Sequence, residues 1–157
     1  MKKSLSTILW AILFFAWATA ASGADLAALD RVSVLMPRTE VVSILGAPDE
    51  VARLGHLKVE LYHVTGAAPL LSSGYIYENE AMLAGHAFIF QGNLAQQTAD
   101  RLKKHGFTPL AEKGTAYRLA GKDDDTGRPV VVTIDVSHDL TTVVTFEQGF
   151  YERSVSR

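Results

Sequence analysis

The chain has 157 residues, of which 48% are hydrophobic and 20% are charged, and it contains no cysteine. This composition is that of an ordinary globular protein. The lack of cysteine excludes disulfides, thiolate metal sites, cysteine nucleophiles and lipid attachment through cysteine. The formal net charge of −2 argues against nucleic acid as a partner, because nucleic-acid-binding proteins present a basic face.

The first two dozen residues have the pattern of an export leader: lysines near the start, a long apolar stretch, and then small side chains. Cleavage after Ala24 fits the small residues that signal peptidase accepts. We therefore expect residues 1–24 to be a signal peptide and residues 25–157 to form one exported, periplasmic domain. The alternative is an uncleaved leader that anchors the chain in the inner membrane, because residues 4–24 carry no charge and are just long enough to span it.

Two helices are expected at the start of the mature chain. Asp25 is a residue type that caps helices, and the first helix ends before Pro37. The second helix starts at Pro37, which suits a first helical position, and its apolar residues recur three and four positions apart. Gly46 ends this helix, because glycine readily adopts the positive φ of a helix terminus, and Pro48 prevents continuation.

Three or four strands are expected after the second helix. Residues 57–62 alternate apolar and polar side chains, and residues 75–77 and 87–90 are rich in β-branched and aromatic types. The intervening serine and glycine residues at 72–74 are interpreted as a loop.

A third helix is predicted to begin with a capping box formed by Asn93 and Gln96. It ends at Gly106, after basic residues that suit a helix C-terminus. Three further strands are expected at residues 115–119, 129–136 and 141–148.

Short connections between these strands imply antiparallel pairing. The expected fold class is therefore α+β, with short helices packed on one face of antiparallel β-meanders in a two-layer arrangement. Each half of the chain, residues 25–92 and residues 93–157, has the pattern of a helix followed by a meander. The halves share few identical residues, so a duplicated unit is a suggestion only.

The sequence predicts no catalytic site and no metal site, because its histidines lack the spacing and clustering of metal ligands. These histidines are His56, His63, His86, His105 and His138. Ser137, His138 and Asp139 include the residue types of a hydrolase triad, but consecutive side chains of an extended segment point apart. Residues 123–127 are interpreted as a hairpin turn, since a calcium loop of this kind needs a glutamate where Ile134 stands. We expect no cofactor and no enzymatic activity.

Aromatic residues are the remaining candidates for binding. Tyr75 and Tyr77 lie two residues apart and so share one face of a strand, as do Phe88 and Phe90. The phenylalanines are expected in the core. Tyrosine has a polar tip suited to interfaces, so Tyr75 and Tyr77 are predicted to bind a partner protein.

One segment carries a recognisable motif. Its residues are Met36, Val41, Leu45, Gly46 and Pro48, with a tyrosine-bearing strand ending at Tyr62. With these residues the chain resembles, over residues 29–64, the SmpA/OmlA family of small outer-membrane assembly lipoproteins. The chain departs from the family motif where Leu35 replaces a glycine and Pro37 replaces a threonine, and it lacks the lipid-bearing cysteine.

The resemblance implies a fold like that of the family and of the similar β-lactamase-inhibitor proteins, which work by binding other proteins. We therefore expect an exported, non-catalytic protein-interaction module of the cell envelope, an accessory to outer-membrane assembly or envelope integrity. Its partners would be envelope proteins, and peripheral contact with a membrane without a lipid anchor stays open. Two alternatives also stay open: a periplasmic carrier of a small molecule or lipid, and an enzyme whose site forms only on folding.

Overall fold

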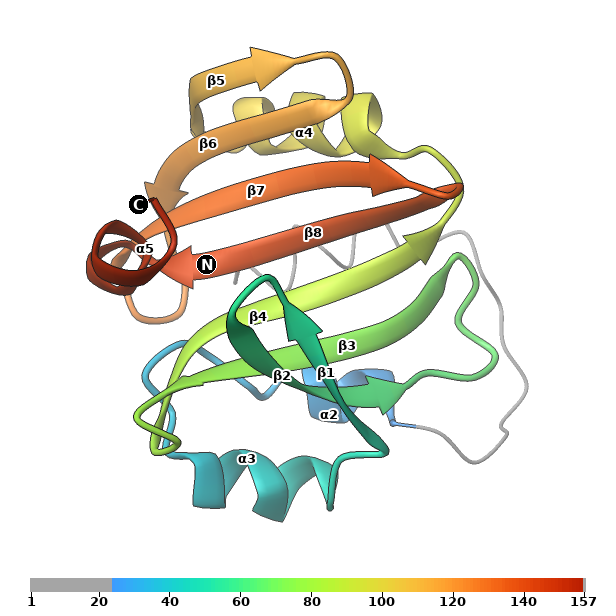
Figure 1. Cartoon of the computed structure of the whole chain (residues 1–157), viewed down its shortest axis with the longest axis vertical. Helices are drawn as coiled ribbons and strands as arrows, with labels where there is room; N and C mark the ends of the chain where they lie inside the picture. The colour runs from blue at the N-terminus through green and yellow to red at the C-terminus, as the bar shows by residue number, and fades with distance from the viewer. Residues whose placement is uncertain (1–23, 157) are drawn as a thin grey trace.

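The computed structural model describes residues 24–156, so the predicted leader lies outside the described residues except for Ala24. The described chain forms one eight-stranded antiparallel sheet with four short helices (Figure 1). In chain order the elements are α2 (Leu26–Leu29), α3 (Arg38–Leu45), β1 (Glu50–Leu54), β2 (Leu57–His63), β3 (Leu70–Glu78), β4 (Met82–Gln91), α4 (Ala95–Lys104), β5 (Thr108–Lys113), β6 (Ala116–Lys122), β7 (Pro129–Ser137), β8 (Leu140–Glu147) and α5 (Gln148–Ser154).

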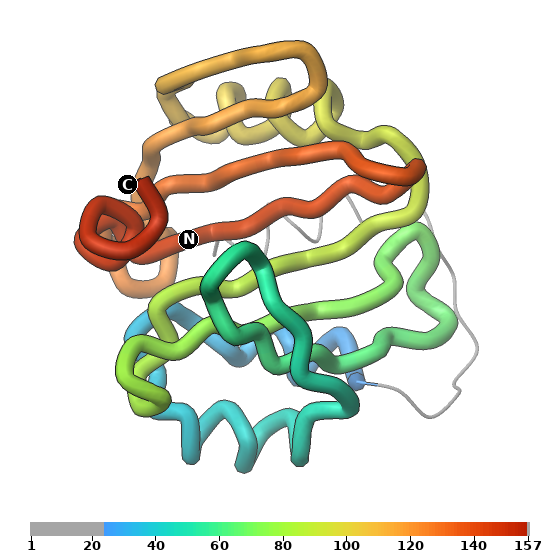
Figure 2. The backbone as a smooth tube through the Cα atoms, viewed as in Figure 1, coloured from blue at the N-terminus to red at the C-terminus, as the bar shows by residue number. Residues whose placement is uncertain are grey.

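The sheet has the strand order β1-β2-β3-β4-β8-β7-β6-β5. In each half of the chain a helix, α3 or α4, is followed by a four-stranded meander, and the two meanders meet along β4 and β8 at the centre (Figure 2). The predicted α+β class is therefore confirmed. The strands β1 and β5 lie at the two edges of the sheet.

The larger core lies between one face of the sheet and the helices α2, α3 and α4. It forms because alternate residues of a strand point to the same face. In β6, Tyr117 and Leu119 belong to this core, whereas Arg118 between them points to the opposite face. The helical residues buried in this core are Leu29, Val41, Ala95, Ala99 and Leu102.

The prediction that all helices cover one face is wrong, because α5 packs on the opposite face. Phe150 and Tyr151 of α5 form a second core with Val144 and Phe146 of β8. The expected strand at 141–148 ends at Glu147, whose carboxylate accepts a hydrogen bond from the Phe150 N–H at 2.7 Å and so caps α5. A helix of seven residues contains too few turns to produce a readable periodic pattern.

One strand count needs correction. The first half holds four strands, within the expected three or four, whereas the second half holds four rather than three. The missed strand is β5, whose residues are all exposed and therefore lack an apolar alternation. It contains Pro109, which is tolerated in an edge strand because one side of that strand needs no partner.

The predicted loop at residues 72–74 is also wrong, since these residues lie inside β3 and are buried. Gly74 is required there by close packing rather than by a turn. A Cβ atom at this position would lie 2.7 Å from the Cγ1 of Val59, closer than two carbon atoms approach. The glycine therefore marks a close approach of two neighbouring strands.

The helix ends agree with the sequence more closely at their C-termini than at their N-termini. Gly46 and Gly106 have φ of +84° and +90°, which confirms both as helix ends. Pro37, however, immediately precedes the first helical residue instead of being that residue. Within residues 24–156, no helix has the length and apolar character needed to cross a membrane.

The predicted capping box at α4 is wrong. Leu94 occupies the N-cap position, and its N–H donates to the Thr141 hydroxyl at 2.8 Å. The Gln96 side chain points outward, where it donates to Asp100 at 3.1 Å, instead of reaching back to Asn93. Asn93 still contributes one bond of the predicted cap, since its Oδ1 accepts a hydrogen bond from the Ala95 N–H at 3.4 Å, and the Thr141 hydroxyl of β8 satisfies the Leu94 N–H.

Candidate functional site

The two tyrosines predicted to bind a partner lie on the face of β3 that the larger core covers. Tyr75 is 1% exposed, and its ring meets that of Tyr62 edge-on with centres 5.5 Å apart. Tyr77 is half-buried, and the guanidinium carbon of Arg38 lies 5.9 Å from its ring centre. The exposure expected of Tyr75 is therefore wrong, because the alternation that pairs the two tyrosines points both toward the core.

Burial raises the pKa of both Tyr75 and Tyr77 above the ordinary value for tyrosine, so both hydroxyls stay protonated near neutral pH. Replacing Tyr75 would remove a buried ring and would report on folding rather than on binding. Of the two phenylalanines expected in the core, Phe90 is fully buried and Phe88 packs against the core while partly exposed.

The motif residues around α3 support the fold. Val41 is fully buried, and Met36 and Leu45 pack against the larger core. The carbonyl oxygen of Gly46 accepts a hydrogen bond from the Tyr62 hydroxyl at 3.0 Å. This bond ties the end of α3 to β2.

The segment before α3 holds a leucine in an unusual conformation. Leu35 has a φ of +68°, a value that favours glycine. The Leu35 N–H donates to the Leu83 carbonyl at 2.7 Å.

Arg38, the first residue of α3, binds the buried Glu60. Its Nε lies 3.0 and 3.2 Å from the two carboxylate oxygens. Pro48, partly buried, lies in the connection from α3 to β1.

The five histidines lie in different parts of the fold. His86 is buried in β4, His105 follows the last residue of α4, and His138 lies in the turn between β7 and β8. His56 lies in the turn between β1 and β2, and His63 is the last residue of β2. Over residues 24–156, no group of three or more histidine, aspartate or glutamate side chains is arranged to hold a metal ion.

A row of polar side chains joins β1, β2 and β3. The Nδ1 atom of His63 lies 3.1 Å from the Ser72 hydroxyl, and its Nε2 atom lies 3.8 Å from a carboxylate oxygen of Glu50. Sequence spacing does not predict this row, because its members come from three strands. These are residue types of nucleophilic catalysis, but Ser72 is 8% exposed and does not line the cavities described below. We therefore assign the row a structural role.

The hairpin turn predicted at residues 123–127 is confirmed. The Asp123 carboxylate accepts hydrogen bonds from the N–H and the hydroxyl of Thr126, which closes the connection between β6 and β7. The expectation that Ser137 and His138 point apart in an extended segment is wrong, because their side chains contact each other at 2.8 Å in an exposed turn. The chain turns there because both His138 and Asp139 have positive φ.

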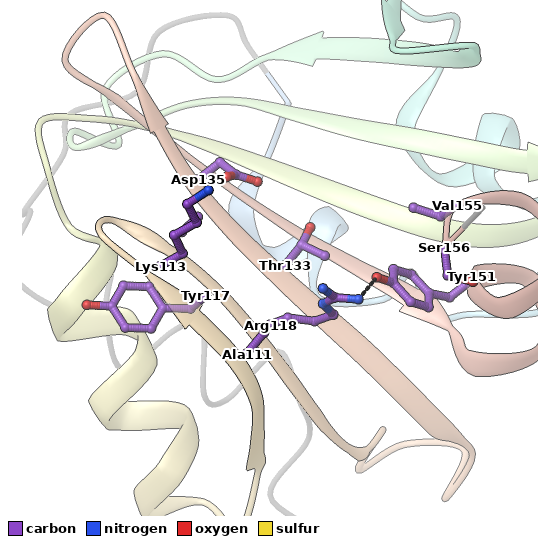
Figure 3. A pocket seen from close by; sticks show the side chains of 10 residues that line it. Ala111, Lys113, Tyr117, Arg118, Thr133, Asp135, Tyr151, Val155 and Ser156 are labelled. Atoms are coloured by element: carbon purple, nitrogen blue, oxygen red, sulfur yellow. Dashed lines mark hydrogen bonds between the residues drawn. The ribbon is translucent and has the colours of Figure 1, made fainter.

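A hollow of about 440 Å³ lies on the open face of the sheet, over β5, β6 and β7 and beside α5 (Figure 3). It forms because the small side chains of Ala111 and Ala116 lie between longer ones. In the register of the sheet, Arg118 of β6 is flanked by Ala111 of β5 and Thr133 of β7. Other side chains that line the hollow are Lys113, Asp135, Tyr151, Val155 and Ser156.

Arg118 is held in place within this hollow. Its Nη1 donates a hydrogen bond to the Tyr151 hydroxyl at 3.0 Å, drawn as a dashed line in Figure 3. Tyr151 is 8% exposed, and its ring centre lies 5.7 Å from that of Phe146, so packing of α5 fixes the acceptor. In the described part of the chain, no ion pair involves Arg118, Lys113 or Asp135.

Two other cavities adjoin α3. One of about 340 Å³ lies between α2 and α3, and one of about 70 Å³ lies beside the Arg38 side chain. The charges around the smaller cavity already pair with each other, Arg38 with Glu60 and Lys58 with Glu80. The hollow beside α5 therefore differs from the smaller cavity in offering charged groups without a partner in the described chain.

The hollow was not predicted from the sequence. Its residues come from β5, β6, β7, α5 and the two residues that follow α5, and neither β5 nor α5 was predicted. The one available signal is the alternation in β6, where apolar Tyr117 and Leu119 leave Arg118 on the outer face.

No protein-family model, curated protein or solved structure matches this chain.

Proposed function

We propose that this protein is an exported, non-catalytic interaction module of the cell envelope, and that it binds a partner protein through the hollow on the open face of its sheet. The observation that carries this proposal is the arginine–tyrosine pair of Arg118 and Tyr151 at the centre of the hollow. Arginine and tyrosine are among the residues that contribute most binding energy at protein interfaces.

The surroundings of the pair favour protein binding. The hollow is built on β-strands, and α5, which packs on the sheet through Phe150 and Tyr151, forms one side of it. Ala111 and Ala116 leave room for side chains from another molecule, while Val155 and Tyr151 provide an apolar border. Tyrosine and arginine are enriched at protein interfaces, where they lie beside apolar surface as they do here.

The cellular setting of the proposal comes from the sequence. The leader pattern of residues 1–24 supports export to the periplasm, and the absence of cysteine leaves no lipid anchor of the SmpA/OmlA kind. The positive φ of Leu35, where that family has glycine, adds a backbone feature to the resemblance. A role as an accessory to outer-membrane assembly or envelope integrity is the part of the proposal that depends on the resemblance.

Site-specific photo-crosslinking in cells tests the proposed surface. A photoreactive phenylalanine analogue at Thr133, inside the hollow, should give a discrete adduct with an envelope protein. The same analogue at the exposed Gln97 on α4 is the matched control and should give none. Absence of an adduct at Thr133, or the same adducts at both positions, would contradict the proposal.

Intact-mass measurement of the exported protein tests the leader. The expected mature chain begins at Asp25, because Ala24 is the last small residue of the cleavage pattern. A full-length mass in the membrane fraction would instead support the uncleaved anchor and would remove the periplasmic assignment.

A further inference from the structure

We propose that the hollow recognises an acidic side chain, an aspartate or glutamate on an exposed loop of the partner protein, through Arg118. The inference rests on the proposed function and adds the chemistry of the partner. It is carried by the distribution of charge in the hollow, by the way Arg118 is held, and by the apolar border next to it.

The charges in the hollow leave one positive charge uncompensated. Lys113 and Asp135 both line the hollow and contribute opposite formal charges, which leaves the formal charge of Arg118 in excess. Arg118 lies one cross-strand row away, beside Thr133, and has no carboxylate partner in the described residues. This excess of one positive charge, in a chain whose formal net charge is −2, complements an acidic group.

The guanidinium of Arg118 is prepared for a carboxylate. Its bond to the Tyr151 hydroxyl uses one donor of Nη1, and an arginine has five N–H donors in a rigid fork that matches the two oxygens of a carboxylate. Because the buried ring of Tyr151 already restrains the guanidinium, binding loses less side-chain freedom than it would at a mobile arginine. Tyr151 is thus a positioning residue for the interaction.

The border of the hollow suits the stem of an acidic side chain. Val155 and the ring of Tyr151 line it on the side of α5. The methylene groups of a glutamate or aspartate can lie against these apolar atoms while the carboxylate meets Arg118. A bare inorganic anion would gain nothing from this border, which favours an acidic side chain as the occupant.

A pair of capped peptides tests the inference. The probes are N-acetylated, C-amidated Gly-Ala-Glu-Ala-Gly and its counterpart with glutamine, titrated into the mature protein at low salt and followed by ¹⁵N NMR. The Glu peptide is expected to shift the Nε signal of Arg118 and the amide signals of Ala111 and Thr133. It should bind at least about tenfold more tightly than the Gln peptide, because only the carboxylate accepts charge-assisted bonds.

Two variants and one control identify the side chains that recognise the Glu peptide. Arg118→Gln should abolish the discrimination between the two peptides, whereas Arg31→Gln, which removes an exposed cation elsewhere, should leave it unchanged. Tyr151→Phe removes only the hydroxyl that holds the guanidinium and should weaken Glu-peptide binding several-fold while the Arg118 Nε signal shifts in the free protein. This second variant keeps the inference testable if Arg118→Gln fails to fold.

The possible outcomes separate the two proposals. Equal shifts with both peptides, or discrimination that survives in Arg118→Gln, would overturn the acidic-side-chain inference even if Thr133 crosslinks to a partner. Binding to vesicles containing anionic phospholipid, without peptide discrimination, would overturn it in favour of a membrane surface. If the peptides are discriminated but Thr133 yields no adduct, the chemistry of the hollow stands and the proposed envelope function fails.

Discussion

Leu35 holds a backbone conformation that is unusual for a residue with a side chain. Its φ of +68° places a branched side chain in the left-handed region, which costs about 1–2 kcal/mol for residues other than glycine. The conformation persists because backbone hydrogen bonds join this segment to the chain at and just before the start of β4. The Leu35 N–H donates to the Leu83 carbonyl, and the Arg38 N–H donates to the Ala81 carbonyl, each at 2.7 Å.

We predict that Leu35→Gly is more stable than Leu35→Ala by about 1 kcal/mol. Both variants remove the leucine side chain, but only glycine adopts positive φ without steric cost. Urea denaturation of the two variants measures the difference. Equal midpoints with equal slopes would show that the backbone at this position is not strained.

His86 is a buried histidine, and its burial makes the stability of the fold depend on pH. Burial lowers its pKa to about 4 against the weaker opposing effect of Asp123, whereas an unfolded chain has a histidine pKa of about 6.5. The folded state therefore binds this proton less readily than the unfolded state does. The contribution of neutral His86 to the free energy of unfolding is therefore fully present above about pH 6.5, and it is lost as the pH falls toward 4.

We predict that the free energy of unfolding decreases by about 3 kcal/mol more in the wild type than in His86→Leu between pH 7 and pH 4, since the variant has no proton to bind at this position. Denaturation at a series of pH values gives both curves. His56→Asn, at an exposed histidine, serves as the control and should keep the wild-type slope. Parallel curves for His86→Leu and the wild type would contradict the prediction.

At the scale of elements, the two helix ends read from the sequence differ in how strictly they need glycine. Gly46 combines φ of +84° with ψ of −167°, a region that is almost restricted to glycine. Gly106 has φ of +90°. Neither position is crowded, since an added Cβ would meet no atom within 4 Å. Substitution there would therefore act through the backbone and not through packing.

We predict that Gly46→Ala and Gly106→Ala each lower the free energy of unfolding by about 1–2 kcal/mol. Ser43→Ala in α3 provides the matched control. Ser43 is an exposed position inside the helix, so the change affects neither a helix end nor the core. Because alanine favours helix, this control should be neutral or stabilising. Thermal melts compare the three, and an unchanged melt for both Gly46→Ala and Gly106→Ala would rule out the strained ends.

At the scale of the whole molecule, the sheet has a well-covered centre and two exposed edges. β4 and β8 pair over seven residues and carry buried side chains for both cores. β5 has exposed side chains throughout, and β1 nearly so, including Val51 and Leu110 at 56% exposure each. Local stability should therefore fall from the centre of the sheet to its edges.

We predict that amide hydrogen exchange is slowest in β4 and β8 and fastest in β1 and β5, because edge strands open without disturbing the core. Exchange measured by NMR gives the order directly. If β5 is as protected as β8, its free edge is covered in solution, as it would be by association of two copies.

Local pattern was sufficient for the α+β class, for the ends of α3 and α4 at Gly46 and Gly106, and for most of the strands. These features depend on neighbours within a few residues: a glycine that accepts positive φ, or side chains that alternate along one strand. The same reasoning failed at β5 and α5. An exposed edge strand has no apolar alternation, and a seven-residue helix has few turns.

The tertiary structure decides which face of each strand or helix is covered by other elements. Alternation places Tyr75 and Tyr77 on one side of β3, but only the packing of helices on that side buries Tyr75. The hollow depends on cross-strand register, which brings Ala111, Arg118 and Thr133 into one row, and on α5 folding back to hold Arg118 through Tyr151. Register and layer order arise from contacts between residues distant in sequence, so spacing along the chain does not contain them.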